Sequence, residues 1–196
     1  MLKRIVQKSF PVNNVTGTSY SSIIDLDSAQ KMSVQAVITV NTPAAATFTA
    51  AVTDICTAAA SGFQTGLKVR LTTTTTLPAG LSLSTDYFVI VIDANTFKLA
   101  SSLALALAGT AVDITDTGTG VHTITPTALA GGTFELQQSN DGTNYSAVAT
   151  ATNVTATASF IIEKVDPCTR FMRLKCVVTA GMFSSENYVL TIGDAV

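Results

Sequence analysis

Residues 32–40 read MSVQAVITV, and apolar and polar side chains alternate along the whole stretch. Successive side chains of a β-strand point to opposite faces, so this alternation predicts a strand with one buried and one hydrated face. Such a strand is typical of an antiparallel sheet that covers a core on one side only. The expected buried face comprises Met32, Val34, Ala36, Ile38 and Val40, and the hydrated face comprises Ser33, Gln35 and Thr39.

The same two-residue period returns in three later stretches, at residues 133–138, 172–178 and 188–192. Because all of these strands have one apolar face, we predict an all-β fold built as an antiparallel, jelly-roll-like β-sandwich. The side chains expected to point inward are Phe134, Leu136, Met172, Leu174, Cys176, Val178, Tyr188, Leu190 and Ile192.

Two turn signals separate these strands. Asp141-Gly142 is suited to the positive φ angles of a tight turn, which predicts a hairpin between residues 134–138 and 144–148. Asp166-Pro167 interrupts the chain between residues 158–163 and 170–178, because proline cannot donate a ladder hydrogen bond.

The segment 44–126 differs from its flanks in its close spacing of Gly, Leu-Pro and Thr-rich turn signals. We expect a short helix over residues 103–108, capped by Ser101 or Ser102 and ended by Gly109. The strands expected in the segment are residues 48–56, 68–72, 87–92, 96–99 and 122–125.

Removal of that segment would place residues 32–40 next to residues 132–138 across a short loop. Both stretches are amphipathic, so we expect them to pair as a hairpin whose tip accepts an insertion. The predicted organisation is an outer β-sandwich domain formed by residues 1–43 and 127–196, with an inserted β-rich domain at 44–126. The alternative is one continuous sandwich of all the strands.

Composition disfavours several classes of function. Of the 196 residues only 12% are charged, against about 25% in an average protein, and the net charge is −2. A chain without excess positive charge has no long-range field to hold a polyanion, so we expect no nucleic-acid partner. No run of about 18 apolar residues predicts a membrane helix, so we expect no membrane partner and folding in a cytoplasm.

Catalytic, metal-binding and cofactor-binding residues are not expected. His122 is the single histidine, and its strand pattern favours a surface position without a nucleophile beside it. Cys56, Cys168 and Cys176 lack ligand-like spacing and are expected to be buried thiols. The turn at residues 113–118 has two aspartates, which either favour a hard cation or form Asx turns. We therefore expect a protein that is not an enzyme.

Several ordered blocks resemble structural proteins of tailed bacteriophages. GLKVRLT at 66–72, LPAGLS at 77–82 and TDYFVIVIDANTFKLASS at 85–102 are similar to a module that recurs in such proteins, and the likeness covers about residues 53–125. GTFELQQSNDGTNY at 132–145, followed by RFMRL at 170–174, resembles small β-sandwich virion proteins. The resemblance implies a virion component.

The expected function is that of a noncatalytic head decoration or auxiliary capsid protein, which stabilises the shell by subunit contacts. It would assemble in the host cytoplasm, reside in the virion, contact the major capsid protein or other virion proteins, and form a homo-oligomer such as a trimer. One alternative is a tail, neck or fibre-base component. The hairpin around Asn140 also resembles discoidin-like carbohydrate-binding sandwiches, in which a tryptophan usually stands where this chain has Tyr145, so an adhesion domain is another alternative.

The candidate binding residues fall into two groups. The first is basic and is expected either to contact a partner or to form a solvated face that blocks edge-to-edge aggregation. It comprises Lys3, Arg4 and Lys8 of an N-terminal arm together with Arg170, Arg173 and Lys175. The second would form the rim of a sugar site and comprises Asn140, Asp141 and Tyr145.

Overall fold

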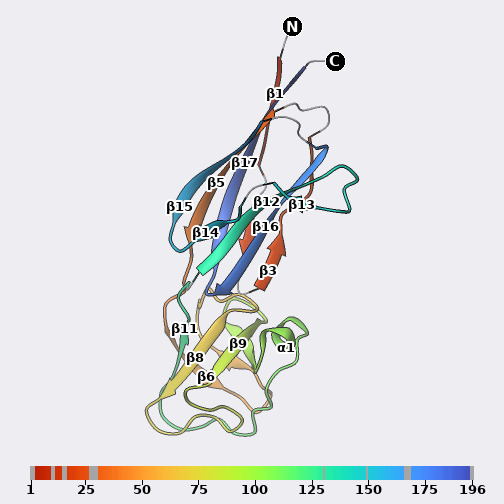
Figure 1. Cartoon of the computed structure of the whole chain (residues 1–196). Helices are drawn as coiled ribbons and strands as arrows, with labels where there is room; N and C mark the ends of the chain where they lie inside the picture. The colour runs from red at the N-terminus through yellow and green to blue at the C-terminus, as the bar shows by residue number, and fades with distance from the viewer. Residues whose placement is uncertain are drawn as a thin grey trace.

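The computed structural model describes residues 3–9, 12–14, 17–26, 31–129, 131–148, 150–165 and 169–194, and nearly all regular structure in them is antiparallel β-strand (Figure 1). The predicted all-β class is confirmed. The strands form two bodies that lie end to end, a pair of sheets and a closed barrel. We call them the two-sheet body and the barrel.

The two-sheet body consists of residues from both ends of the chain. Its first sheet has the order β1-β17-β5-β15, with β2 also paired to β17. These strands are β1 (Lys3–Ser9), β2 (Val12–Asn14), β5 (Lys31–Val40), β15 (Ala158–Val165) and β17 (Phe183–Asp194). The second sheet has the order β13-β12-β16-β3, with β14 on β12 and β4 on β16. Its strands are β3 (Gly17–Tyr20), β4 (Ile24–Asp25), β12 (Gly131–Ser139), β13 (Ser146–Ala147), β14 (Thr152–Val154) and β16 (Phe171–Ala180).

One apolar core lies between these two sheets. The alternation predicted for β5 is confirmed, since Val34, Ala36 and Ile38 are fully buried and Val40 is partly buried. The inward faces predicted for β12 and β16 are confirmed as well, at Phe134, Leu136, Met172, Leu174, Cys176 and Val178. The predictions for the side chains of Met32, Tyr188, Leu190 and Ile192, and for the Asp166-Pro167 break, lie outside what the structure describes.

The expected hairpin between β5 and β12 is wrong. β5 pairs with β17 and β15 in the first sheet, whereas β12 pairs with β16, β13 and β14 in the second. An amphipathic strand buries its apolar face against the facing sheet, whichever strand is its hydrogen-bonded neighbour, so the alternation does not determine the pairing. The barrel is therefore inserted into a crossover between sheets and not into the tip of a hairpin.

The barrel closes in the order β10-β7-β6-β11-β8-β9. Its strands are β6 (Ala46–Ala50), β7 (Cys56–Thr57), β8 (Lys68–Thr73), β9 (Asp86–Val91), β10 (Thr96–Ala100) and β11 (His122–Pro126). The chain enters on β6 and leaves on β11, and these strands are neighbours with Ala46 opposite Ile124. The predicted single strand at 48–56 is wrong, because the chain turns through Asp54 at φ +65° and the Asp54 carboxylate accepts a hydrogen bond from the Ile114 N–H at 2.9 Å.

The short helix is confirmed as α1 (Leu103–Leu107). Its first turn is capped by the Ser102 hydroxyl, which accepts a hydrogen bond from the Leu105 N–H at 3.2 Å. After the helix the chain reverses through Gly109, whose φ of +73° is the left-handed conformation typical of a helix end.

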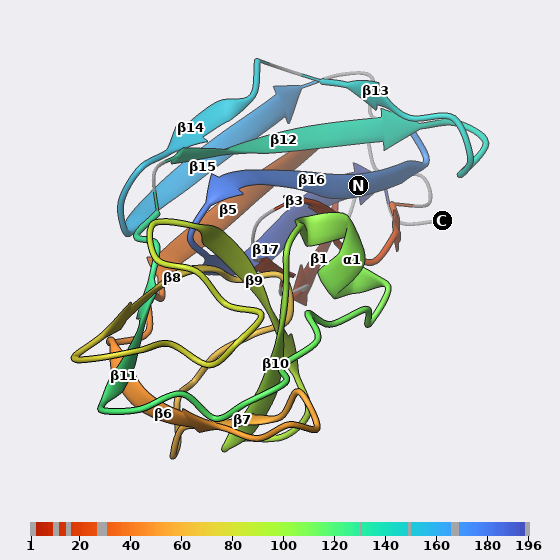
Figure 2. The same ribbon diagram turned by 90° about the horizontal axis from the view of Figure 1, so that it is seen from below.

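The two bodies are in contact where the barrel meets the β16–β17 turn. Met182 belongs to that turn, yet its side chain is 5% exposed and packs in the barrel core. The Asn41 N–H donates to the Met182 carbonyl at 3.4 Å. On the other side α1 lies beside β3, where Leu103 approaches Gly17 (Figure 2). The remaining described members of the barrel core all come from residues 48–124.

Candidate functional site

The loop at residues 140–145 joins β12 to β13. The predicted hairpin is confirmed by the pairing of Gln137 with Ala147 and of Gln138 with Ser146, but the positive φ angle predicted for Asp141 is wrong. Gly142 has a φ of +73°, whereas Asp141 does not adopt a positive φ. A longer loop is stable here because the Ser139 and Asp141 side chains accept hydrogen bonds from four of its N–H groups.

Asp141 is the centre of this loop. One of its carboxylate oxygens accepts hydrogen bonds from the N–H groups of Thr143 and Asn144, each at 2.8 Å, and from the Ser139 hydroxyl at 2.7 Å. The other oxygen accepts from the Asn144 side-chain amide at 2.8 Å. The Asn144 donors, followed by those of Thr143 and Ser139, hold the pKa of Asp141 well below its ordinary value. The carboxylate is therefore engaged in shaping the loop.

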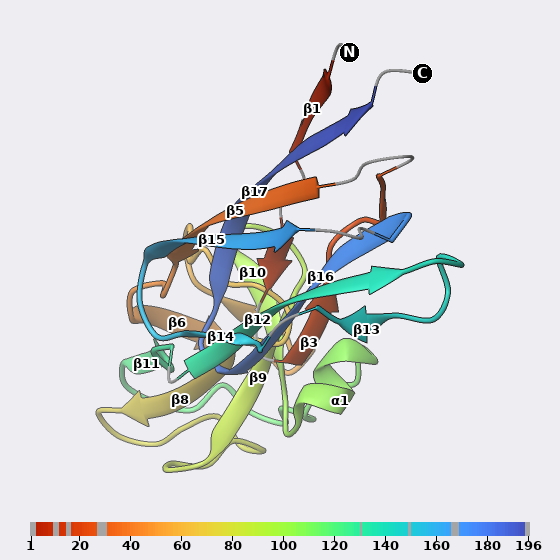
Figure 3. The same ribbon diagram turned by 45° about the horizontal axis from the view of Figure 1, so that its top comes forward.

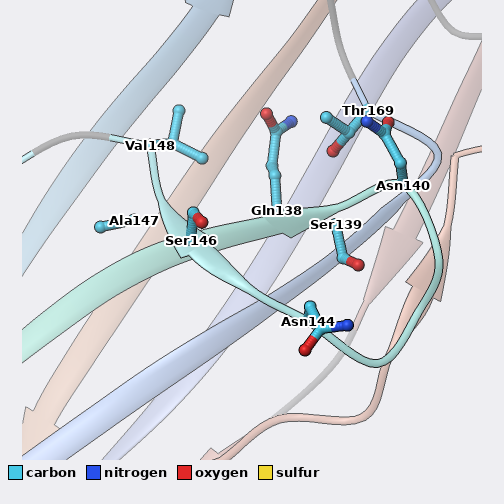
Figure 4. Close-up of a pocket in the computed structure, with 8 residues that line it drawn as sticks. All are labelled: Gln138, Ser139, Asn140, Asn144, Ser146, Ala147, Val148 and Thr169. Atoms are coloured by element: carbon cyan, nitrogen blue, oxygen red, sulfur yellow. The ribbon is translucent and has the colours of Figure 1, made fainter.

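Asn140 and Asn144 of the loop line part of an open hollow of about 300 Å³ (Figure 4). Its surface is mainly amide and hydroxyl groups, which suit hydrogen bonding to a neutral polar ligand. Of the three residues predicted as a ligand rim, the hollow contains Asn140 and neither Asp141 nor Tyr145. Its lining residues are Gln138, Ser139, Asn140, Asn144, Ser146, Ala147, Val148 and Thr169.

Arg173 lies on the outer face of the second sheet, held between two tyrosines. Its guanidinium carbon is 4.2 Å from the centre of the Tyr20 ring and 4.0 Å from that of the Tyr145 ring. Tyr20 comes from β3 on one side of β16, and Tyr145 comes from the β12–β13 loop on the other (Figure 3). Contacts of this kind are cation–π interactions, and they fix the plane of the guanidinium group.

A hydrogen-bonded chain on the same face fixes Arg173 further. Its Nε–H donates to the Gln137 side-chain oxygen at 2.8 Å, and the Gln137 amide nitrogen donates to Glu135 at 2.7 Å. Lys175 lies opposite both Glu135 and Tyr20 in the strand register. We call Arg173, Lys175 and the residues that surround them, namely Tyr20, Glu135, Gln137 and Tyr145, the arginine face.

Arg170 is separate from the arginine face, although the sequence groups it with Arg173 and Lys175. Its guanidinium group forms a two-pronged ion pair with Asp25, with distances of 3.0 and 3.2 Å, and it stacks on the Phe171 ring. The sequence contains no signal for Tyr20, Gln137 or Asp25 as parts of this region. Only the register of β16 with its neighbours brings Tyr20 to Arg173.

The N-terminal basic residues lie on a paired strand. β1 pairs with β17 from Lys3 opposite Asp194 to Ser9 opposite Tyr188, so Lys3, Arg4 and Lys8 belong to an edge strand of the first sheet. Their side chains lie outside what the structure describes. Their proposed role as contacts to a partner stays a prediction.

His122 is buried in the barrel, so the predicted surface position is wrong. The side chain is 4% exposed and packs on Phe48, with ring centres 5.5 Å apart. Nδ1 is 2.9 Å from the Thr73 hydroxyl and Nε2 is 3.2 Å from the Thr117 carbonyl. Side chains of β11 do alternate between the two faces, but His122 lies on the inner face with Ile124. Burial of this polar ring is tolerated because the two hydrogen bonds satisfy its nitrogens.

The predicted burial of Cys56 and Cys176 is confirmed, and Cys168 lies outside the described residues. Burial raises the pKa of both thiols to about 12, with the nearby Asp54 charge contributing at Cys56. In the acidic turn, Asp116 accepts hydrogen bonds from the N–H groups of Ala79 and Gly118, each at 2.8 Å. Within the described ranges, no three His, Cys, Asp or Glu residues are grouped to hold a metal ion.

No protein-family model matches the chain, and no curated protein matches it. In the part of the chain that the structure describes, no helix has the length and hydropathy needed to span a bilayer.

We expect the stability of the 140–145 loop to depend on pH through Asp141. Because folding lowers the pKa of Asp141, its charge stabilises the native state above the ordinary aspartate value of about 4 and this contribution is lost as pH falls below that value. Asp141→Asn should therefore lower Tm at pH 7, and the difference from the unmodified chain should shrink between pH 4 and pH 2.

Thermal unfolding followed by circular dichroism would measure this difference. Asp113→Asn is the matched control, because Asp113 is exposed and its carboxylate makes no hydrogen bond within the described residues. A Tm difference for Asp141→Asn that stays constant down to pH 2 would contradict the expected role of the charge.

Proposed function

We propose that this chain is a noncatalytic structural protein of a tailed-phage particle. Its role would be head decoration, in which a jelly-roll-like sandwich docks on the capsid and the barrel projects into solvent. One observation carries the proposal. β1 and the end of β17 lie at the end of the two-sheet body remote from the barrel (Figures 1 and 3). One end of the molecule is thereby available for attachment while the other is displayed. The blocks that resemble phage structural proteins fall on both bodies.

The physical basis of the function would be area burial repeated over a lattice. A standard interface removes about 800 Å² from each partner, and many simultaneous contacts hold a shell together more strongly than one. The proposed partners are the major capsid protein or other virion proteins, with closed symmetry such as a trimer at the docking position. The proposed location is the virion.

Purified particles test this proposal directly. We expect the chain to be present in a copy number that matches the symmetry of the capsid lattice, measured by quantitative mass spectrometry against the major capsid protein. A few copies per particle would instead assign the chain to the tail, neck or fibre base. Complete absence from particles would refute a virion role.

A carbohydrate-binding adhesion domain is the second candidate function. The observation that favours it is the hollow lined in part by Asn140 and Asn144, whose amide and hydroxyl groups suit sugar hydroxyls. Tyr145 does not form part of that hollow, since its ring contacts Arg173. The candidate sugar-binding residue is therefore Asn140, together with Asn144.

A further inference from the structure

Arg173 has hydrogen-bond donors that the fold holds in place without giving them a partner among the described residues. Its Nε–H is bonded to Gln137, while its two terminal nitrogens have no hydrogen-bond or ion-pair partner among the described residues. The Tyr20 and Tyr145 rings and the Gln137 bond already restrict the side chain. Binding at the terminal nitrogens would therefore cost less conformational entropy than binding to a free surface arginine.

The arginine face contains a second cation, Lys175, at a distance from Arg173 that the geometry of the strand determines. Lys175 follows Arg173 by two residues on β16, so both side chains lie on the outer face about 7 Å apart along the strand. Lys175 has no ion pair within the described residues. Alternate side chains of an extended peptide have the same spacing, so two acidic residues separated by one position fit both cations.

Glu135 favours a carboxylate over a phosphate on this face. Its charge is next to Gln137 and opposite Lys175, so it repels an approaching anion, and the repulsion is larger for a doubly charged phosphate than for a carboxylate. The terminal edge of a guanidinium group matches the two oxygens of a carboxylate. The Tyr145 hydroxyl, buried in the same cluster, also lacks a hydrogen-bond partner in the described part of the chain.

From this geometry we propose that the arginine face is a docking site for an extended acidic segment of a partner protein, with one carboxylate on the terminal nitrogens of Arg173 and the next on Lys175. The inference rests on the proposed function in that the partner would be another protein of the particle. Arg170 is not part of the site, because Asp25 already neutralises it.

The test uses the ¹⁵N-labelled full chain and two peptides. One peptide has glutamate at alternate positions, and the other has glutamine in their place. NMR of the backbone amide signals of β16, which every variant retains, should show saturable shifts with the glutamate peptide and none with the glutamine peptide. Arg173→Lys keeps the positive charge but removes the paired terminal N–H donors of the guanidinium group, so it should weaken binding by about tenfold or more. Arg170→Lys is the matched control and should bind as the unmodified chain does.

Each alternative outcome has a defined meaning. Equal binding of both peptides, or unchanged affinity in Arg173→Lys, would overturn the proposal. Inorganic phosphate competing at lower concentration than acetate would show a phosphate site instead and would also overturn it. If Arg173→Lys fails to fold, Lys175→Gln tests the second contact and should weaken binding several-fold. Because the peptide experiment uses the isolated chain, its result is independent of whether the protein is found in particles.

Discussion

Replacing residues 44–126 by a short Gly/Ser linker should leave a two-sheet body that still folds and unfolds cooperatively. The linker has a short distance to span, because the barrel is entered and left on paired strands, with Ala46 opposite Ile124. The core of the two-sheet body contains no described residue from the barrel. We expect a loss of no more than about 2 kcal/mol, the order of one buried side chain's contacts, measured by urea unfolding with NMR signals of Val34 and Leu136.

Met182 determines the design of the control. In the full chain it packs in the barrel core, so the shortened chain would expose it to water. A second shortened chain with Met182→Ser separates this exposure from the question of independent folding. If that variant also lacks a cooperative transition, the two bodies depend on one another for folding and the division at 44 and 126 is wrong.

Strand period predicted the buried faces and not the strand neighbours. For β5, the alternation in residues 32–40 shows that Val34, Ala36 and Ile38 face the core, as the structure confirms. The same pattern is compatible with pairing to any strand that has an apolar face of similar length. Which strands pair depends on long-range register, and the period of a single strand contains no information about it. The expected pairing of β5 with β12 failed for that reason.

The arginine face was beyond sequence reasoning for a related cause. The sequence groups Arg173 and Lys175 with Arg170 in one basic cluster, but Tyr20 is distant in the chain and reaches Arg173 only through the register of β3 on β16. His122 shows the opposite error. The strand pattern predicts a hydrated position for this polar residue, although two hydrogen bonds and the Phe48 ring make burial favourable.

Gly118→Ala should destabilise the barrel far more than Gly109→Ala, although both glycines have nearly the same backbone conformation, at φ +66° and +73°. Alanine in this left-handed region costs roughly 1–2 kcal/mol at either site. A Cβ at Gly109 would meet nothing within 4 Å, whereas at Gly118 it would lie 2.6 Å from both the Pro78 nitrogen and the Thr76 carbonyl oxygen. We expect a total loss of about 2–5 kcal/mol for Gly118→Ala, since overpacking adds about 1–3 kcal/mol.

The contacts at Gly118 are with backbone, so no side chain can rotate away to accommodate the new methyl group. Relief would require separating the segment around Thr76 from Thr119, which exchange two backbone hydrogen bonds of 2.9 and 3.2 Å. The loss should therefore appear as faster amide exchange at Thr76 and Thr119 and as an earlier urea midpoint for the barrel signals. Signals from the two-sheet body should move little. Equal losses for the two glycine variants would mean that backbone conformation alone, and not close packing of the 74–80 and 114–120 loops, sets the cost at Gly118.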